Sequence, residues 1–172
     1  MKQQDVKIVQ VLAPLADRFN GSPDTKVVQL ATYSECLFII NMGANTGAAG
    51  RIKIYAFADR NINSEIAAKY HKQAIGYWYR AGSGSAPDTE GAWTRVEAGA
   101  EVTLAAAKCV NTQCLVAVSP VEASAIMQAA GYEGGAVHLN LNEAVDDPIV
   151  GSVTCVLAGG ISKDNLPGAY VS

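Results

Sequence analysis

The chain has 172 residues, with 13 Lys and Arg against 16 Asp and Glu, which gives a formal net charge of −3. This balance excludes the strongly basic surface of a dedicated nucleic-acid-binding protein. A chain of this length can bury roughly 70% of the surface that its unfolded form exposes, so it needs neither disulfides nor a structural metal to form a core. Only 17% of the residues are charged and the mean hydropathy is +0.12, so we expect a globular domain with a largely uncharged surface.

The sequence shows no sign of secretion, membrane insertion or disulfide formation. Residues 1–7 are polar and mixed in charge, without the apolar stretch of a signal peptide, so we expect synthesis in the cytoplasm. The longest charge-free windows, residues 36–50 and 148–162, are interrupted by Gly and are too short to cross a bilayer. No C-x-x-C pair is present, so we expect no zinc site and four reduced, buried cysteines: Cys36, Cys109, Cys114 and Cys155.

Short strands dominate the predicted secondary structure. In chain order they are expected at residues 26–30, 36–40, 51–58, 74–80, 93–96, 101–104, 114–118, 137–142 and 152–157. The clearest alternation places Val137, Leu139 and Leu141 on one face of a half-buried strand and polar residues on the other.

Two of these strands are expected to pair as a hairpin. The segment from Cys36 to Ile40 is apolar on both faces, and the segment from Arg51 to Ala58 alternates. The small-residue stretch from Gly43 to Gly50 lies between them and predicts a flexible loop. It lacks the Gly-Lys-Ser/Thr ending of a phosphate-binding loop, so a simple connection is the better interpretation.

One α-helix follows the strand predicted at residues 114–118. Ser119 suits its N-cap, Pro120 its first position and Glu122 its third position, where Glu122 completes a capping box. A glycine, Gly131, suits the position after the C-terminus. A second, short helical turn is predicted between Ser64 and Tyr70.

These elements predict an all-β, mainly antiparallel fold: a β-sandwich or jelly-roll-like barrel of about eight strands with one short α-helix near residues 120–130. No internal repeat or interdomain linker is apparent, so residues 1–172 are expected to form a single domain. Its two ends lack a clear amphipathic period. We therefore expect an irregular N-terminal arm over about residues 1–20 and an irregular C-terminal tail over about residues 159–172.

No residue pattern indicates catalysis. Two histidines are candidate general bases, but neither lies in a recognisable triad with a nucleophile and a carboxylate. His138 occupies the polar face of a strand, where we expect it to be exposed to solvent, and His71 lies in a charged connector. The stretch from Gly82 to Ser85 matches neither a dinucleotide-binding fingerprint nor a nucleophile elbow, and Asp146 to Pro148 predict a turn rather than a calcium site. We expect no enzymatic activity, no cofactor and no bound metal.

An aromatic group at Tyr77, Trp78, Tyr79 and Trp93 has two interpretations. Alternation places Tyr77 and Tyr79 on one face of a strand and Trp78 on the other. The rings can pack in the core on one face and simply cover the sheet on the other. Alternatively, one face meets a neighbouring subunit, because Tyr and Trp are enriched at protein interfaces. Stacking on single-stranded nucleic acid is disfavoured, since few basic residues lie beside the rings.

Several short segments follow one another in a recognisable order over about residues 15–160. They are Ala16 to Pro23, Val27 to Leu30, Tyr33 with Cys36 to Ile40, Gly43 to Gly50, Ile52 to Ala56, Tyr77 to Arg80, Val118 with Glu122 and Ala123, Gly131 with Tyr132, and Val137 to Leu139. In this order they resemble the small virion proteins of tailed bacteriophages and prophages, a group of capsid decoration, or cement, proteins and auxiliary virion structural proteins. The segments are structural and bring no catalytic residues with them.

The resemblance implies a non-enzymatic virion protein, made in the host cytoplasm and located on the capsid surface. Such a protein binds the outer face of the major capsid protein lattice, commonly as a homotrimer, and contacts neither nucleic acid nor a membrane directly. The candidate subunit-interface residues are Tyr77, Trp78, Tyr79 and Trp93. The alternatives are a tail or head-to-tail joining component, and then a carbohydrate-binding module or an enzyme.

Overall fold

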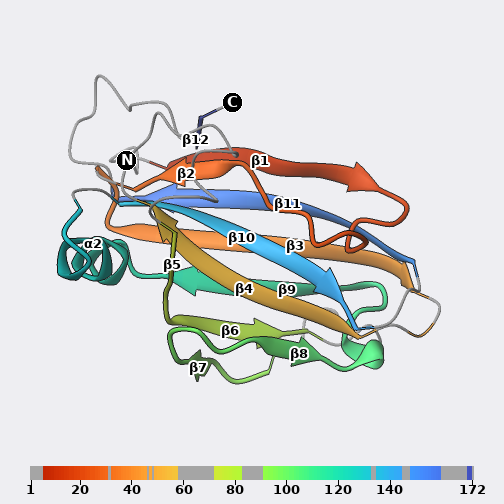
Figure 1. The fold of residues 1–172 in the computed structure, drawn as a ribbon. Coiled ribbons are helices and arrows are strands. Elements are labelled where there is room, and N and C mark those ends of the chain that lie inside the picture. The colour runs from red at the N-terminus through yellow and green to blue at the C-terminus, as the bar shows by residue number, and fades with distance from the viewer. Residues whose placement is uncertain are drawn as a thin grey trace.

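The computed structural model describes residues 6–30, 32–45, 47, 49–57, 72–82, 91–132, 135–144, 148–159 and 170–171. It confirms the predicted all-β sandwich, because two antiparallel sheets lie face to face (Figure 1). The first sheet has the strand order β1 (Val6–Leu15), β11 (Ile149–Ala158), β3 (Glu35–Asn45), β9 (Thr112–Val118), β6 (Tyr77–Ala81) and β7 (Thr94–Val96). The second has the order β12 (Tyr170–Val171), β2 (Val27–Gln29), β10 (Ala136–Glu143), β4 (Gly50–Phe57) and β5 (Gln73–Ala74), and β8 (Val102–Leu104) also pairs with β4.

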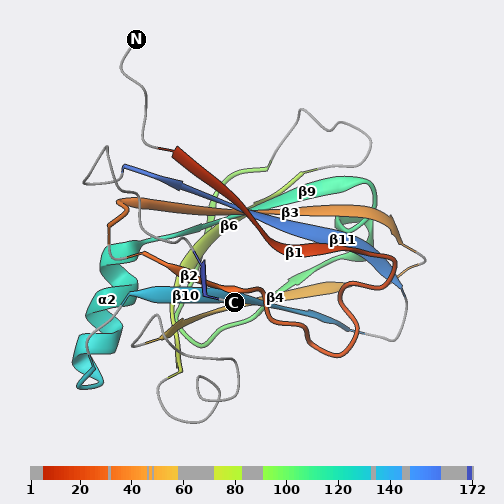
Figure 2. The same ribbon diagram turned by 90° about the horizontal axis from the view of Figure 1, so that it is seen from above.

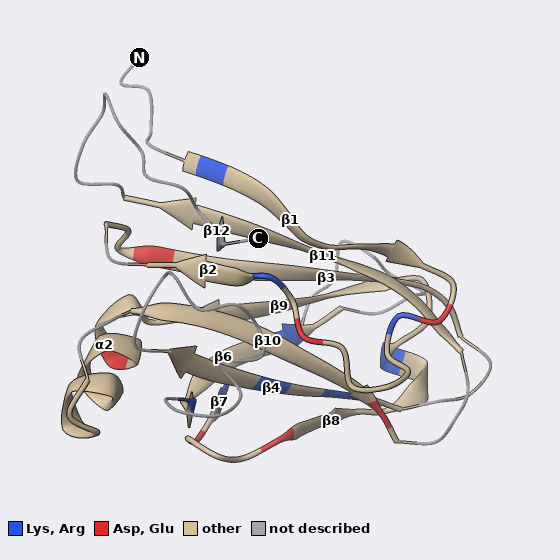
Figure 3. Cartoon of the chain, turned by 45° about the horizontal axis from the view of Figure 1, so that its top comes forward, with Lys and Arg blue, Asp and Glu red and all other residues tan. Residues whose placement is uncertain are grey.

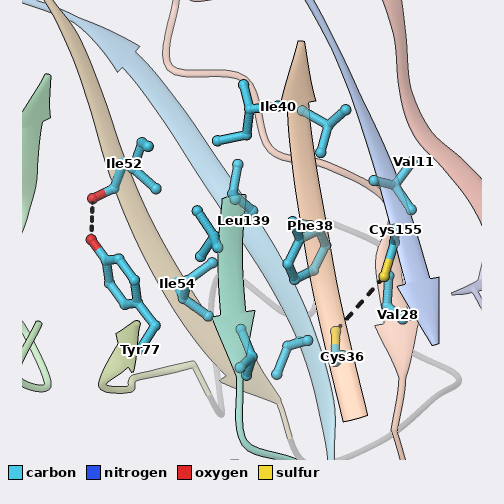
Figure 4. Packing of buried hydrophobic residues seen from close by; sticks show 14 of the residues in the cluster. Val11, Val28, Cys36, Phe38, Ile40, Ile52, Ile54, Tyr77, Leu139 and Cys155 are labelled. Atoms are coloured by element: carbon cyan, nitrogen blue, oxygen red, sulfur yellow. Dashed lines mark hydrogen bonds between the residues drawn. The ribbon is translucent and has the colours of Figure 1, made fainter. Parts of the chain in front are cut away.

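An apolar core fills the space between the two layers. Figure 2 shows β9, β3, β11 and β1 in one layer and β2, β10 and β4 in the other, with the helix α2 (Pro120–Ala129) at one end. Phe38 and Ile40 come from β3, Ile54 from β4 and Leu139 from β10 (Figure 4). Each of the four is at most 1% exposed. Full burial of one such side chain contributes about 1.5–3 kcal/mol to the free energy of unfolding, so this apolar core is the main source of stability.

The predicted helix is confirmed as α2, and its start follows the expected capping chemistry. The side chain of Ser119 accepts a hydrogen bond of 3.2 Å from the backbone N–H of Glu122. Ala123 and Met127, four residues apart, are buried on the inward side of the helix. The helix packs against β4 and β10, so it closes one end of the sandwich. A 3-10 helix, η1 (Ala106–Lys108), precedes β9.

Replacing Ser119 by Ala is expected to lower the free energy of unfolding by about 1 kcal/mol, because the N–H of Glu122 loses its acceptor. Chemical denaturation of the two proteins measures the difference. Ser124→Ala is the matched control, since the Ser124 hydroxyl accepts only a long bond of 3.5 Å from Gln128 on the exposed side of α2. Equal losses in the two variants would contradict the capping role.

Each predicted strand overlaps an observed one, but the strand predicted at residues 74–80 is two strands. The structure places β5 in the second sheet and β6 in the first, so the chain crosses between the sheets at Ile75 and Gly76. A Cβ atom added to Gly76 would overlap the ends of the Arg95 and Glu122 side chains. The sequence shows one apolar run here because Ile75 at the crossing and Tyr77 on β6 are both buried in the same core.

The predicted hairpin of residues 36–40 and 51–58 is wrong. In the structure, β3 lies in the first sheet between β11 and β9, whereas β4 lies in the second sheet between β10 and β5. Both strands turn apolar side chains toward the same core. Their local pattern is therefore the same whether they pair within one sheet or face each other across two.

The irregular N-terminal arm predicted over about residues 1–20 is wrong for residues 6–15, because they form β1. This strand pairs with β11 and buries Val9 and Val11 in the core. Three other apolar side chains of the strand, Val6, Ile8 and Leu15, are exposed, and its register shifts twice in its second half. Apolar residues on both faces and an irregular register remove the alternation that marks a strand in a sequence.

The remaining expectations concern the C-terminal tail, the cysteines and the membrane. Tyr170–Val171 form β12 against β2, while residues 160–169 and the helical turn predicted at Ser64 to Tyr70 lie outside the described residues. All four cysteines are buried and unlinked, as predicted, and the sulfurs of Cys36 and Cys155 are 3.7 Å apart. Among the described residues, no helix combines the length and the apolar character needed to cross a bilayer.

Candidate interaction surface

The four aromatic residues noted in the sequence divide between the core and the surface. Tyr77 is 1% exposed, and Tyr79 on the same face of β6 is half-buried against the core. Trp78 points the other way and is 46% exposed, and Trp93, just before β7, is 41% exposed. The predicted alternation is therefore confirmed. The interface prediction is wrong for Tyr77, which lies inside the core, and stays a prediction for the other three.

The Tyr77 hydroxyl ties the two sheets together. It donates a hydrogen bond of 2.7 Å to the backbone carbonyl of Ile52 on β4 (Figure 4). Burial raises the pKa of Tyr77, and a hydrogen bond with the backbone of Val102 partly opposes that effect. Ile52 and Val102 are partners in the pairing of β4 with β8. The phenol of Tyr77 thus links the first sheet to β4 of the second.

Two arginines accompany the exposed tryptophans on the outer face of the first sheet. Trp78 on β6 is the cross-strand partner of Arg95 on β7, whose guanidinium carbon lies 5.7 Å from the centroid of the Trp78 ring. The guanidinium carbon of Arg80 lies 5.0 Å from the centroid of the Trp93 ring. Both distances suit cation–π contacts. We call these four residues the tryptophan–arginine cluster.

An ion pair connects this cluster to α2. Nη2 of Arg95 lies 2.5 Å from Oε1 of Glu122, and the two side chains are 27% and 29% exposed. The hydrogen bond to Glu122 raises the pKa of the Arg95 guanidinium, so its charge is retained at neutral pH. Because Glu122 belongs to α2, the helix holds Arg95 beside Trp78 and balances one of the two arginine charges.

The strands that lie between β1 and β6 in the first sheet are almost uncharged (Figure 3). The three strands β11, β3 and β9 contain one charged residue among them, Glu35. Leu37, Ile39 and Ala117 lie at positions that are partly exposed. Such a face can be buried against a partner protein at a low cost in desolvation.

The outer face of the second sheet is charged by contrast. Arg51 and Lys53 on β4 lie 3.6 Å and 3.8 Å from the Glu101 carboxylate, and Lys72 lies 3.9 Å from the Asp24 carboxylate. Partly exposed pairs of this kind contribute about 0–1 kcal/mol each, and they keep the surface hydrated. The two faces of the sandwich thus differ in chemistry, and the first is the better suited to a protein partner.

His138, expected on a solvent-exposed strand face, is in fact 4% exposed. Its ring meets Phe57 and Tyr55 edge-on, with centroids 4.6 Å and 5.6 Å away, as part of a small apolar region on the outer side of the second sheet. Its Nε2 atom lies 3.6 Å from Oδ1 of Asp24 and has no hydrogen-bond partner. Burial lowers the pKa of His138 to about 4, against a smaller opposing effect of Asp24, so the ring is neutral at pH 7.

A groove of about 490 Å³ lies beside α2. Its described lining is uncharged and includes Leu30 and Tyr33 from the chain between β2 and β3, and Val121 and Ala125 from the helix. The hydroxyl of Tyr33 is buried without a hydrogen-bond partner. No sequence signal indicated this groove, because the residues that line it are far apart in the chain.

The other sequence features considered for chemistry have structural explanations or lie outside the described residues. The backbone N–H of Gly47 donates a bond of 2.8 Å to Oδ1 of Asn45, a local turn in the predicted loop. Burial raises the pKa of the Cys114 thiol to about 12, so it is protonated at neutral pH. No three His, Cys, Asp or Glu side chains gather as metal ligands within the described part of the chain. Neither His71 nor residues 83–85 and 146–147 belong to that part.

Comparison with known proteins identifies no family. No family model matches the sequence, and no curated protein matches it. Among solved structures, the chain is similar to the SPBc2 prophage-derived protein YomS, with a TM-score of 0.44 and 14% sequence identity over 92% of this chain and 97% of that chain. A likeness at this level carries no argument about function.

Proposed function

We propose that this chain is a non-enzymatic structural protein of a tailed-phage virion, a capsid decoration protein that binds and stabilises the major capsid protein lattice. The observation that carries the proposal is the nearly uncharged outer face of the first sheet, where Trp78 and Trp93 are 46% and 41% exposed. Exposed Trp and Arg side chains on such a face are typical of protein interfaces. The order of segments that resembles decoration proteins supports the same role.

The mechanism in this proposal is a shift of equilibrium. A protein that binds the expanded lattice more tightly than dissociated capsid subunits stabilises the lattice by its difference in affinity. Many modest contacts, repeated over the shell, act together through avidity. A homotrimer on the capsid surface multiplies the contacts of each copy, and the role requires neither a cofactor nor a metal.

Particles of the phage that encodes the chain are expected to contain it in a copy number comparable to that of the major capsid protein. Quantitative mass spectrometry with labelled peptide standards for both proteins measures the ratio. The same sheet face would serve a tail or head-to-tail joining component, and a ratio that corresponds to one ring per particle would assign the chain there instead. Absence from purified particles would contradict a virion role, and binding to a glycan array would favour a carbohydrate-binding module.

A further inference from the structure

The outer face of the first sheet carries one row of side chains that crosses all six strands in register. From β1 to β7, cross-strand pairing joins Ile8, Val156, Leu37, Ala117, Trp78 and Arg95. The flanking residues along the strands, such as Val9, Phe38 and Tyr77, are buried in the core, so the row points away from it. All of its members except Arg95 are apolar.

The two ends of this row differ in shape. At β1, Ile8 is 69% exposed and Val6 is 42% exposed, and we call these two residues the aliphatic margin. At the other end lies the tryptophan–arginine cluster, which presents broad aromatic rings. The two ends are roughly 20 Å apart, at about 4.8 Å per strand.

Both arginines on this face have a partner within the chain. Arg95 pairs with Glu122 at 2.5 Å and lies 4.0 Å from Glu97, and Arg80 lies over the ring of Trp93. A face with so few charges attracts nucleic acid or a strongly acidic peptide only weakly. It is suited to an apolar surface of another protein.

The size of the face is comparable to what a stable protein pair requires. Six strands at about 4.8 Å spacing, with three or four outward positions on the longer ones, span roughly 24 Å by 20 Å, on the order of 500 Å² in projection. Stable complexes bury about 800 Å² of accessible surface on each partner, and the relief of the side chains adds to the projected value.

We propose that this face binds a second copy of the chain, with the aliphatic margin of one copy packed on the tryptophan–arginine cluster of the next. Unlike ends fit each other better than like ends, because two clusters in contact would bring their arginines together. Such contacts join two copies reciprocally or close a ring of copies. This inference deepens the homo-oligomer of the proposed function and rests on it for its biological role. The face then joins neighbouring copies on the capsid surface, another surface of each copy contacts the lattice, and the contact between copies itself needs no capsid.

The full chain in solution is expected to self-associate, as measured by sedimentation over a concentration series. Ile8→Lys is expected to weaken the association about tenfold or more, because its ammonium group would be buried beside Arg80 and Arg95 of the next copy. Val121→Lys is the matched control, since Val121 is a 77% exposed apolar residue on α2, and it is expected to change the association by less than about twofold. Thermal melts followed by circular dichroism establish that each variant is folded.

A mixing experiment tests which ends meet. Ile8→Lys and Trp78→Glu are each expected to impair association alone, and an equimolar mixture of the two variants is expected to recover it, because opposite charges then face each other. A mixture that fails to recover would overturn the pairing of unlike ends. A wild-type chain that stays monomeric at every concentration, or an Ile8→Lys variant that associates like the wild type, would overturn the whole inference. Neither result changes the copy number in particles, so the proposed function is tested separately.

Discussion

Replacing Tyr77 by Ala is expected to lower the free energy of unfolding by about 3–5 kcal/mol, and replacing it by Phe by about 1–2 kcal/mol. The Ala variant leaves a cavity at a site that is 1% exposed. The Phe variant retains the ring and removes only the hydroxyl, which leaves the carbonyl of Ile52 without a 2.7 Å hydrogen bond in the core. Urea denaturation of the three proteins measures both differences.

Tyr79→Phe is the matched control for the hydroxyl of Tyr77. Tyr79 lies on the same face of the same strand but is half-buried, so loss of its hydroxyl is expected to have little effect on stability. Equal losses for Tyr77→Phe and Tyr79→Phe would contradict a hydroxyl bond that links the two sheets. A loss in Tyr77→Ala no larger than that in Tyr77→Phe would contradict close packing around the ring.

Stability is expected to fall by roughly 3 kcal/mol as the pH drops from about 6.5 to about 4, because of His138. The pKa of His138 is about 4 in the folded chain and 6.5 in the unfolded chain. Between these values the unfolded state binds the proton more tightly, so acid favours unfolding. This loss of stability is absent above about pH 6.5 and complete below about pH 4.

Urea denaturation at a series of pH values measures this effect, and His138→Leu is expected to flatten the pH dependence because its side chain never ionises. The chain has two histidines, so the ring signal that disappears from the NMR spectrum of this variant belongs to His138. That signal is expected to titrate near pH 4 in the wild type. A midpoint near 6.5, or an unchanged pH dependence in the variant, would show that the ring is not held in a desolvated site.

The difference between the two sheet faces links the fold to the proposals. Ion pairs of Arg51, Lys53 and Lys72 cover the outer face of the second sheet and favour contact with water. The first sheet instead turns Ile8 and Trp78 outward in one row. A protein whose role is to join repeated neighbours requires this kind of surface, and in our proposal the same row binds a second copy of the chain.

Much of the local structure could be predicted from the sequence. The alternation of Val137, Leu139 and Leu141 predicted β10, and the capping pattern at Ser119 predicted the start of α2. For the candidate interface, alternation correctly placed the side chains of Trp78 and Tyr77 on opposite faces of β6. These features depend on neighbours a few residues away, so the sequence pattern contains them.

Other features depended on contacts between distant segments. β1 pairs with β11 at the other end of the chain, with Val6 opposite Ala158, and its own residues do not alternate cleanly. His138 sits at a position that is polar by pattern but enclosed by Phe57 and Tyr55. The outer row is apolar only because six strands align, and no single strand shows it.

Alternation and capping act over a few residues, so the amino-acid pattern alone predicts short strands and one capped helix around an apolar core. The separate sheets of β3 and β4, the burial of His138 and the shared exposed row of Ile8 and Trp78 emerge only when the chain is folded. Strand pairing and the covering of a sheet face depend on which distant segments bury the most apolar surface together, and local patterns do not contain that information.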